Sequence, residues 1–535
     1  MALNLRTGTL STLVDLCWGI PEENTLTASA SERAGPMAFR ASLTAACCRT
    51  LLNSAKFATI LHKIVGSPGS NRGMGVCEWE DGGREPMLKN VANANRFDNL
   101  HPGLSQDEAL RILALPVEQL ESGSDRYMAT SHLINFPGER SEQALLNLLE
   151  ENDESQPTRL AKRKAVEVLA RLGCTAALAP IGVCLFSKDP YLVENAAWAL
   201  QQLGCQDPAI QNRMITLLAD PDQNRRVLAQ SLAGLGVKNA LPAIAALQDN
   251  ESPGVRGAAL AAVATLNGEN ERISELAELL FLPNQMDRQS AIQDVINAEA
   301  VPLLGQVLEA PVSPVFRLRA LRLLWPGAEP HCHDLSLLET IDRLLWDHPD
   351  SVSLVHRYEE IPENSFLIDE LFGTDFSRCY LALQTLASGV VPELWPLLEQ
   401  RWLEEAHNDY GAHYFFLRLF GQIGSWGDAH TKVEDLCESA IHNRRPQFLK
   451  SRPAGILALM RVNPSRLRPL LRNLVEAKVE PNWECRYVAL MAYQTLLQEG
   501  TVLDAGEIAA ILSKSDPDLF VECKRSLVVS LCTDL

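Results

Sequence analysis

The segment around residues 190–204 combines side chains suited to binding a flat, conjugated molecule. Glu194 and Trp198 are four residues apart, so on a helix they share one face. The indole can stack on a conjugated ring, and the carboxylate can accept hydrogen bonds from the N–H groups of a cationic ring system. Tyr191, one turn earlier, adds a second ring for stacking. These residues form a candidate binding face.

Neighbouring segments carry arginine near the place where this segment carries Glu194. They are Arg163, Arg225, Arg226, Arg256, Arg288, Arg317 and Arg319. A guanidinium group binds a carboxylate through two parallel hydrogen bonds, so nearby arginines suit a ligand with acid tails. The residue types alone favour a competing interpretation, in which Trp198 packs in the core and the arginines form ion pairs between repeats.

Other kinds of site have little support in the sequence. The richest group of potential metal ligands is His331-Cys332-His333-Asp334. Adjacent residues of an extended loop point to opposite sides, so they rarely bind one ion together. The sequence has no P-loop, nucleophile elbow or H-E-x-x-H motif. We expect no metal site, and we expect His407 and His413 to be solvated residues at a helix end.

A regular repeat must position the candidate residues. Glycines end helical runs at Gly173, Gly204, Gly236 and Gly268. Prolines recur at Pro157, Pro190, Pro221, Pro253, Pro283 and Pro314. Both series have a period of about 31 residues, which is typical of repeats that stack on their neighbours.

One repeat shows how each unit forms. A first helix is predicted over 178–186 and a second over 191–203. Asp189 can cap the second helix, Pro190 fits its first turn, and Gly204 can adopt the left-handed conformation that ends it. The predicted fold is therefore all-α, an α-solenoid of HEAT-like helical hairpins. In such arrays the second helices line the concave surface, where Glu194 and Trp198 would lie.

The repeat divides the chain into three expected parts. Residues 1–86 have no repeat signature, and 66–86 are rich in Gly, Ser and charge, so we expect a poorly ordered or atypical extension. Residues 87–330 are predicted to form regular repeats that carry the binding face. The period weakens after residue 330, so 331–535 are expected to continue the solenoid as degenerate repeats.

Composition narrows the functional classes. The formal net charge is −19, so non-specific binding to nucleic acid is not expected. No apolar run is long enough to span a membrane, and no secretion signal begins the chain. The 13 cysteines form no C-x-x-C pair and suit reduced thiols. We therefore expect a cytoplasmic protein without membrane insertion.

Three segments give the sequence a family resemblance. They are Arg96-Phe-Asp-Asn-Leu-His-Pro-Gly-Leu-Ser105, Leu120-Glu-Ser-Gly-Ser-Asp-Arg-Tyr-Met-Ala129 and His132-Leu-Ile-Asn-Phe-Pro-Gly138. Together they resemble the E/F-type phycobilin lyases of cyanobacteria, and within them the phycoerythrobilin lyases that act on phycoerythrin α-subunits. The helix Val193-Glu-Asn-Ala-Ala-Trp-Ala-Leu200 also resembles the HEAT-like repeat of that family. The resemblance extends from about Arg96 to the C-terminus.

The resemblance implies a chaperone-like enzyme. Such a lyase binds a linear tetrapyrrole and delivers it to a cysteine of a phycobiliprotein α-subunit through a thioether bond, with orientation as its main contribution. It implies no cofactor, because phycoerythrobilin is the substrate. Glu194 would hold the pyrrole nitrogens as the catalytic residue, and Tyr191 and Trp198 would stack on the bilin. Arg225, Arg226 and Arg256 would meet its propionates.

The sequence leaves two alternative functions open, as well as the need for a second subunit. Some members of the family convert phycoerythrobilin to phycourobilin during attachment. One branch of these lyase-isomerases carries an Asn-His-Cys-Gln-Gly-Asn-like motif, of which this chain has only His331-Cys332. A HEAT-repeat adaptor or chaperone that binds protein without catalysis is the second alternative. The sequence does not decide whether the protein acts together with a second lyase or chaperone subunit.

Overall fold

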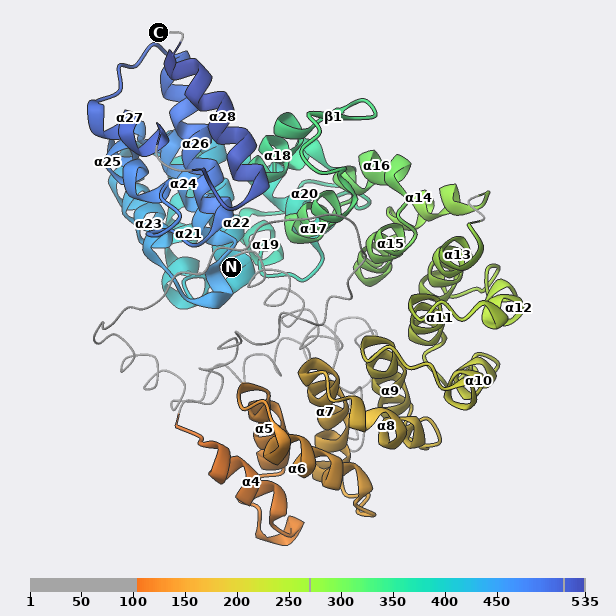
Figure 1. The fold of residues 1–535 in the computed structure, drawn as a ribbon. Coiled ribbons are helices and arrows are strands. Elements are labelled where there is room, and N and C mark those ends of the chain that lie inside the picture. Colours follow the sequence, from red (N-terminus) through yellow and green to blue (C-terminus); the bar gives the residue numbers. More distant parts are fainter. Residues whose placement is uncertain (1–102, 269–270, 513–514, 534–535) are drawn as a thin grey trace. The chain divides into compact units, whose positions relative to one another are not determined.

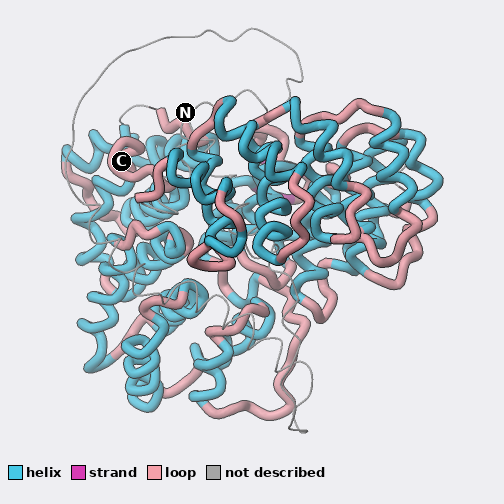
Figure 2. The backbone as a smooth tube through the Cα atoms, turned by 90° about the horizontal axis from the view of Figure 1, so that it is seen from below, coloured by secondary structure: helices cyan, strands magenta, loops and turns pink. Residues whose placement is uncertain are grey.

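A computed structural model describes residues 103–268, 271–512 and 515–533, and helical hairpins make up almost all of this described part. Most of the described backbone is helix joined by short loops (Figure 2). The extension expected over residues 1–86 lies outside the described residues. The described chain divides between Leu203 and Gly204 into an N-terminal unit and a C-terminal unit. The boundary expected near residue 330 therefore lies inside the C-terminal unit.

The N-terminal unit, described from residue 103 to Leu203, consists of three helical hairpins. Its helices are α4 (Gln106–Ala114), α5 (Asp125–His132), α6 (Glu139–Glu150), α7 (Gln156–Leu172), α8 (Leu178–Cys184) and α9 (Pro190–Gln202). The second helices of the hairpins, α5, α7 and α9, pack on one another in sequence order and form one layer (Figure 1). The first helices, α4, α6 and α8, form the other layer.

The C-terminal unit begins with four more hairpins of the same kind. They are α10 (Pro208–Leu217) with α11 (Arg225–Gly234), α12 (Leu241–Ala245) with α13 (Pro253–Asn267), α14 (Leu276–Leu279) with α15 (Gln285–Asn297), and α16 (Leu304–Glu309) with α17 (Pro314–Leu324). The second helices α11, α13, α15 and α17 again pack in sequence order and form one layer (Figure 1).

The later part of this unit is less regular. A short antiparallel hairpin pairs β1 (His331–Cys332) with β2 (Leu335–Ser336). The helices that follow are α18 (Leu337–Trp346), α19 (Asn364–Glu370), α20 (Phe376–Ala387), α21 (Val391–Arg401), α22 (Tyr410–Ile423), α23 (His430–His442), α24 (Ser451–Val462), α25 (Pro464–Leu474), α26 (Trp483–Gln498), α27 (Ala505–Leu512) and α28 (Leu519–Thr533).

The repeat signals have the structural roles that the sequence predicts. Asp189 is the N-cap of α9 and accepts a hydrogen bond from the backbone N–H of Tyr191 at 3.1 Å. Pro190 and Pro253 each begin a second helix. Gly173 ends α7 with a φ of 72°, which a side chain would strain. The prediction of an all-α HEAT-like solenoid is confirmed.

A buried ion pair connects three successive second helices. Arg226 of α11 reaches Asp294 of α15 through two hydrogen bonds of 2.7 and 2.8 Å. The Arg226 guanidinium also donates a hydrogen bond to the carbonyl of Gly254, in the first turn of α13. Gly257 of α13 leaves room for this carboxylate, because a Cβ there would lie 2.6 Å from Asp294 Oδ2. The pair fixes the register of three repeats.

Helix α18 is enclosed by the second helices of the later repeats. It packs against α24, α26 and α28. Asp342 of α18 forms an ion pair of 2.6 Å with the fully buried Lys524 of α28 and accepts a hydrogen bond of 2.9 Å from Tyr487 of α26. Arg418 of α22 donates to the carbonyl of Leu345. The second helices of these repeats therefore face α18.

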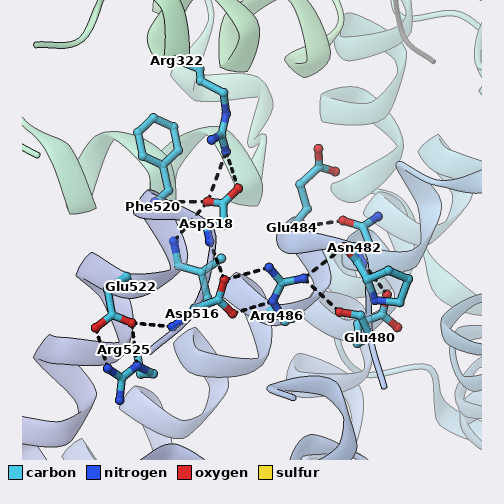
Figure 3. A network of polar contacts seen from close by, with 12 residues as sticks. Arg322, Glu480, Asn482, Glu484, Arg486, Asp516, Asp518, Phe520, Glu522 and Arg525 are labelled. Carbon is cyan, nitrogen blue, oxygen red and sulfur yellow. Dashed lines mark hydrogen bonds and ion pairs between the residues drawn. The ribbon is translucent and has the colours of Figure 1, made fainter. Parts of the chain in front are cut away.

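The last repeat also contacts α17, through Arg322. Its guanidinium lies against two rings, 4.4 Å from the centroid of Trp483 and 4.3 Å from that of Phe520. It also pairs with Asp518 at 3.2 Å. Figure 3 shows this pair beside a second one, in which Arg486 binds Asp516 through two hydrogen bonds. Helices far apart in the sequence are thus joined by charge and by ring stacking.

Replacing Arg322 with alanine should lower the free energy of unfolding of the C-terminal unit by about 2 kcal/mol, since the contacts of a cation with two rings and a charged hydrogen bond are lost. The midpoint of urea unfolding, followed by tryptophan fluorescence, measures this. Arg378→Ala is the matched control. That side chain is 54% exposed and lies 3.5 Å from Glu370, so its loss should cost less than about 1 kcal/mol. Equal effects of the two variants would contradict the role given to Arg322.

Candidate functional site

One face of α9 carries the three residues expected to bind a conjugated ligand. Tyr191, Glu194 and Trp198 are each partly exposed, whereas Leu192, Val193, Ala196, Ala197, Ala199 and Leu200 of the same helix are buried. Their spacing of three and four residues places them on one side of the helix. Trp198 is therefore not a core residue, as the competing interpretation required.

Cations of α7 lie over both aromatic rings of this face. The Arg163 guanidinium is 4.5 Å from the centroid of the Tyr191 ring, and the Arg171 guanidinium is 5.5 Å from the centroid of the Trp198 ring. Arg163 is held by two hydrogen bonds to Asp189, the residue that caps α9. Each ring therefore has one contact with a guanidinium and sits in a defined orientation.

Glu167 links the cations along α7. It accepts hydrogen bonds from Lys164 at 2.6 Å and from Arg171 at 2.8 Å. Burial raises the pKa of the Glu167 carboxyl, but the charges of Lys164 and Arg171 outweigh burial and lower it overall. Glu167 therefore stays ionised near neutral pH and holds Arg171 beside Trp198. The resulting surface of α7 and α9 alternates cations, carboxylates and rings, and we call it the α9 face.

The predicted arginines do not behave alike. Arg225 of α11 and Arg256 of α13 are partly exposed, and no described residue makes a hydrogen bond or ion pair with either guanidinium. Both belong to the C-terminal unit, whereas the α9 face belongs to the N-terminal unit. The two arginines lie on neighbouring helices that pack together. They keep free donors for an acidic ligand.

The expectation for Arg226 is wrong. Its side chain is buried, and its donors are used by Asp294, by the carbonyl of Gly254 and by the carbonyl of Ser290. A guanidinium held in this way has no donors to offer a propionate. The competing interpretation, an ion pair between repeats, describes Arg226 correctly. It also describes Arg163 with Asp189, Arg288 with Asp375 and Arg317 with Asp347.

Arg159 was not predicted from the sequence as a site residue. It lies on α7 one turn before Arg163, is partly buried, and has a buried Nε without a hydrogen-bond partner among the described residues. The spacing of four residues puts it in the same row as Arg163. That spacing was the available signal, but Arg159 falls outside the repeated arginine position. Arg159 therefore adds a guanidinium to the row of cations along α7.

No candidate metal site is present in the part of the chain that the structure describes. No group of three or more His, Cys, Asp or Glu side chains there could hold an ion. His331 and Cys332 form strand β1, and His333 follows with a φ of 51° in the turn of the hairpin. None of the described helices has the length and apolar character needed to cross a membrane.

Comparison with known proteins identifies the chain's relatives. No protein-family model matches it. It is 41% identical over 412 residues to the bilin biosynthesis protein CpeY of Synechococcus sp. (strain WH8020), which covers 77% of this chain and 98% of that protein. It is 29% identical over 250 residues to the phycocyanobilin lyase subunit alpha of Picosynechococcus sp., covering 43% of this chain and 93% of that protein.

Among solved structures, the complex of CpcE and CpcF of the phycocyanin lyase from Nostoc sp. PCC7120 is similar at 24% sequence identity. The match has a TM-score of 0.37 and covers 46% of this chain and 93% of that one. The family assignment rests on the sequence relatives, above all on the match along nearly the whole of CpeY. The chain belongs to the E/F-type phycobilin lyases, the family that includes CpeY.

Proposed function

We propose that this lyase attaches phycoerythrobilin through a thioether bond to a cysteine of a phycobiliprotein, and that the acceptor is the phycoerythrin α-subunit. The observation that carries the proposal is the 41% identity to CpeY across 98% of that protein. The α9 face supports it, since two partly exposed rings and a carboxylate on one side of a helix suit a conjugated, protonatable ligand.

The reaction needs orientation more than it needs a catalytic group. The thiol of the acceptor adds across a carbon–carbon double bond of the bilin, so the sulfur bonds one carbon, the proton ends on the other, and nothing leaves. No cofactor is required for this addition. When the bilin is held in one conformation beside one cysteine, the two reactants no longer have to find the reactive geometry by chance, which lowers the entropic part of the barrier. Glu194 would favour the protonated, electrophilic bilin, and Tyr191 and Trp198 would fix its plane.

The attacking thiolate belongs to the acceptor. Burial raises the pKa of Cys174 and of Cys184 to about 11, so both are protonated at neutral pH. Burial also raises the pKa of Cys379 and of Cys437 well above the usual thiol value. A protonated, buried thiol is a poor nucleophile. These cysteines suit packing, and a bilin bound nearby would not be captured by them.

The test is co-production of the chain with phycoerythrobilin synthesis and an apo-phycoerythrin α-subunit, with and without a second lyase subunit. We expect a denatured α-subunit that fluoresces with zinc and has a phycoerythrobilin spectrum. A urobilin spectrum would show isomerisation as well as attachment. A colourless α-subunit in every combination, together with a colourless lyase, would refute the proposal and favour the protein-binding adaptor.

Replacing Arg225 and Arg256 together with glutamine should raise the bilin concentration needed for half-maximal transfer by about 100-fold, or about tenfold for each charged hydrogen bond that is lost. Transfer rates measured against bilin concentration test this. Arg378→Gln, a change on an exposed side chain of the same unit, is the control and should leave the curve unchanged. If the double variant also leaves it unchanged, the two arginines do not contact the propionates.

A further inference from the structure

A third aromatic ring of the N-terminal unit lies on the other side of α7 from α9. Tyr127 belongs to α5 and is partly exposed. The ammonium of Lys164, on α7, is 5.7 Å from the centroid of the Tyr127 ring. The α9 face does not include this ring, and the chemistry of attachment has not yet used it.

The Tyr127 ring is joined to the α9 face by a continuous series of contacts. Lys164 contacts the ring and also donates a hydrogen bond of 2.6 Å to Glu167. Glu167 accepts a second hydrogen bond, of 2.8 Å, from Arg171, whose guanidinium contacts the Trp198 ring. The three α7 residues are spaced by three and four positions, so they lie on one face of the helix. Tyr127 and Trp198 therefore border the same surface from opposite sides of α7.

Helix α7 supplies a separate cation to each ring of this surface. Two of its arginines contact the two rings of the α9 face, and Lys164 contacts Tyr127 in the same way. A cation against a ring favours one orientation of that ring. Because the rings are held before a ligand arrives, less side-chain freedom is lost when the ligand binds. Tyr127 thus shares the feature that suits the α9 face to a conjugated ligand.

The width of the surface suits a ligand of several linked rings. Helices α5, α7 and α9 pack in sequence order and form one layer (Figure 1). The axes of packed helices are about 8–10 Å apart, so those of α5 and α9 are about 16–20 Å apart. An extended tetrapyrrole has four rings in a row, so its two ends can reach rings on both helices. A ligand of one or two pyrrole rings would reach one side only.

We propose that Tyr127 binds the bilin, which lies across α7 in an extended conformation with one end against Tyr127 and the other against Trp198. The inference rests on the proposed function, because it takes the bilin as the ligand. It deepens that function by assigning the direction in which the ligand lies, across three helices of the N-terminal unit. A side chain of the acceptor protein is the competing occupant of Tyr127.

Titration of phycoerythrobilin into wild-type protein and three variants tests the contact. We expect Tyr127→Leu to raise the Kd by about fivefold, within the range for the loss of one pair of stacked rings. Tyr127→Phe keeps the ring and should bind as wild type does. Phe136→Leu is the matched control and should leave the Kd unchanged. Phe136 is another partly exposed ring of the same unit, and it packs against His132 at 5.3 Å instead of joining the series of contacts along α7.

The absorption spectrum of the bound bilin gives a readout that a packing role would not change. An extended bilin absorbs more strongly in the visible band, relative to the near-ultraviolet band, than a coiled one does. We expect the ratio of the two bands to fall in Tyr127→Leu, because one end of the ligand is then free to coil. Trp198→Leu should lower the ratio as well, because it frees the other end. Tyr127→Phe and Phe136→Leu should keep the wild-type ratio.

The outcomes separate the inference from the function on which it rests. Wild-type protein that binds no phycoerythrobilin would refute the proposed function, and the inference with it. If wild type binds and Tyr127→Leu keeps the wild-type Kd, only the inference is overturned, and weaker capture of the apo-α-subunit by that variant would assign Tyr127 to the acceptor. A higher Kd with an unchanged spectrum would assign Tyr127 to packing against α7, which also overturns the inference. The stoichiometry of each titration gives the folded fraction, so misfolding of a variant is distinguished from weaker binding.

Discussion

Replacement of Asp294 by alanine is expected to lower the free energy of unfolding of the C-terminal unit by about 3–5 kcal/mol, because it leaves the Arg226 guanidinium buried without its counter-ion. Asp294 is almost fully buried, with a side chain 1% exposed. It accepts two hydrogen bonds from Arg226 and one of 3.1 Å from Gln230. The midpoint of urea unfolding, followed by circular dichroism, measures the loss.

Two further variants decide whether the buried charge is the cause. Asp249→Ala removes an 83% exposed carboxylate that pairs with Arg272, and should cost less than about 1 kcal/mol. Arg226→Met combined with Asp294→Leu removes both charges and should recover most of the loss, since apolar residues can replace a buried ion pair. A double variant as unstable as Asp294→Ala would show that packing around Gly257 dominates, and would refute the explanation.

Replacement of Glu194 by glutamine is expected to lower the rate of bilin transfer by about 100-fold, within the range for loss of one positioned proton-transfer or charge-stabilising group. An amide keeps the size of the side chain but cannot stabilise a protonated tetrapyrrole. The absorption spectrum of bound bilin should therefore lose the band of the protonated form at a lower pH than in wild type. Single-turnover transfer to the α-subunit measures the rate, and a pH titration of the spectrum measures the protonation.

The matched control is Glu150→Gln, which changes an exposed carboxylate at the end of α6 in the same unit. Its transfer rate and its spectrum should equal those of wild type. If Glu194→Gln transfers bilin normally, Glu194 has no catalytic role. If it transfers slowly but the spectrum titrates as in wild type, the carboxylate positions the bilin without stabilising its protonated form.

The fold could be predicted because each of its signals is local. Asp189, Pro190 and Gly204 act within a few residues of their own positions, so the sequence alone shows where a second helix begins and ends. The shared face of Tyr191, Glu194 and Trp198 follows from helical spacing in the same way. The loss of regularity near residue 330 was also visible in the weakening period, and it corresponds to the β1–β2 hairpin.

Partners distant in sequence could not be predicted. Arg225 and Arg226 are adjacent and chemically identical, yet one has no described partner and the other is buried against Asp294, 68 residues further on. Only the packing of α11, α13 and α15 decides which side chain points inward. His413 shows the same limit, because it was expected to be solvated and is instead buried beside Trp402 and Phe448, which come from two other segments. Tertiary contacts determine which of these side chains is buried, and a repeat pattern in the sequence carries no information on them.

The enclosure of α18 has a consequence for how the C-terminal unit folds. In a simple solenoid each repeat contacts only its neighbours, so folding can spread from any repeat and repeats can be removed from an end. Here Asp342 is paired with Lys524, 182 residues later. Chain closure over that length must precede the contact, which slows folding relative to a solenoid with local contacts alone. Removal of α27 and α28 would also uncover α18, so this unit cannot be shortened one repeat at a time.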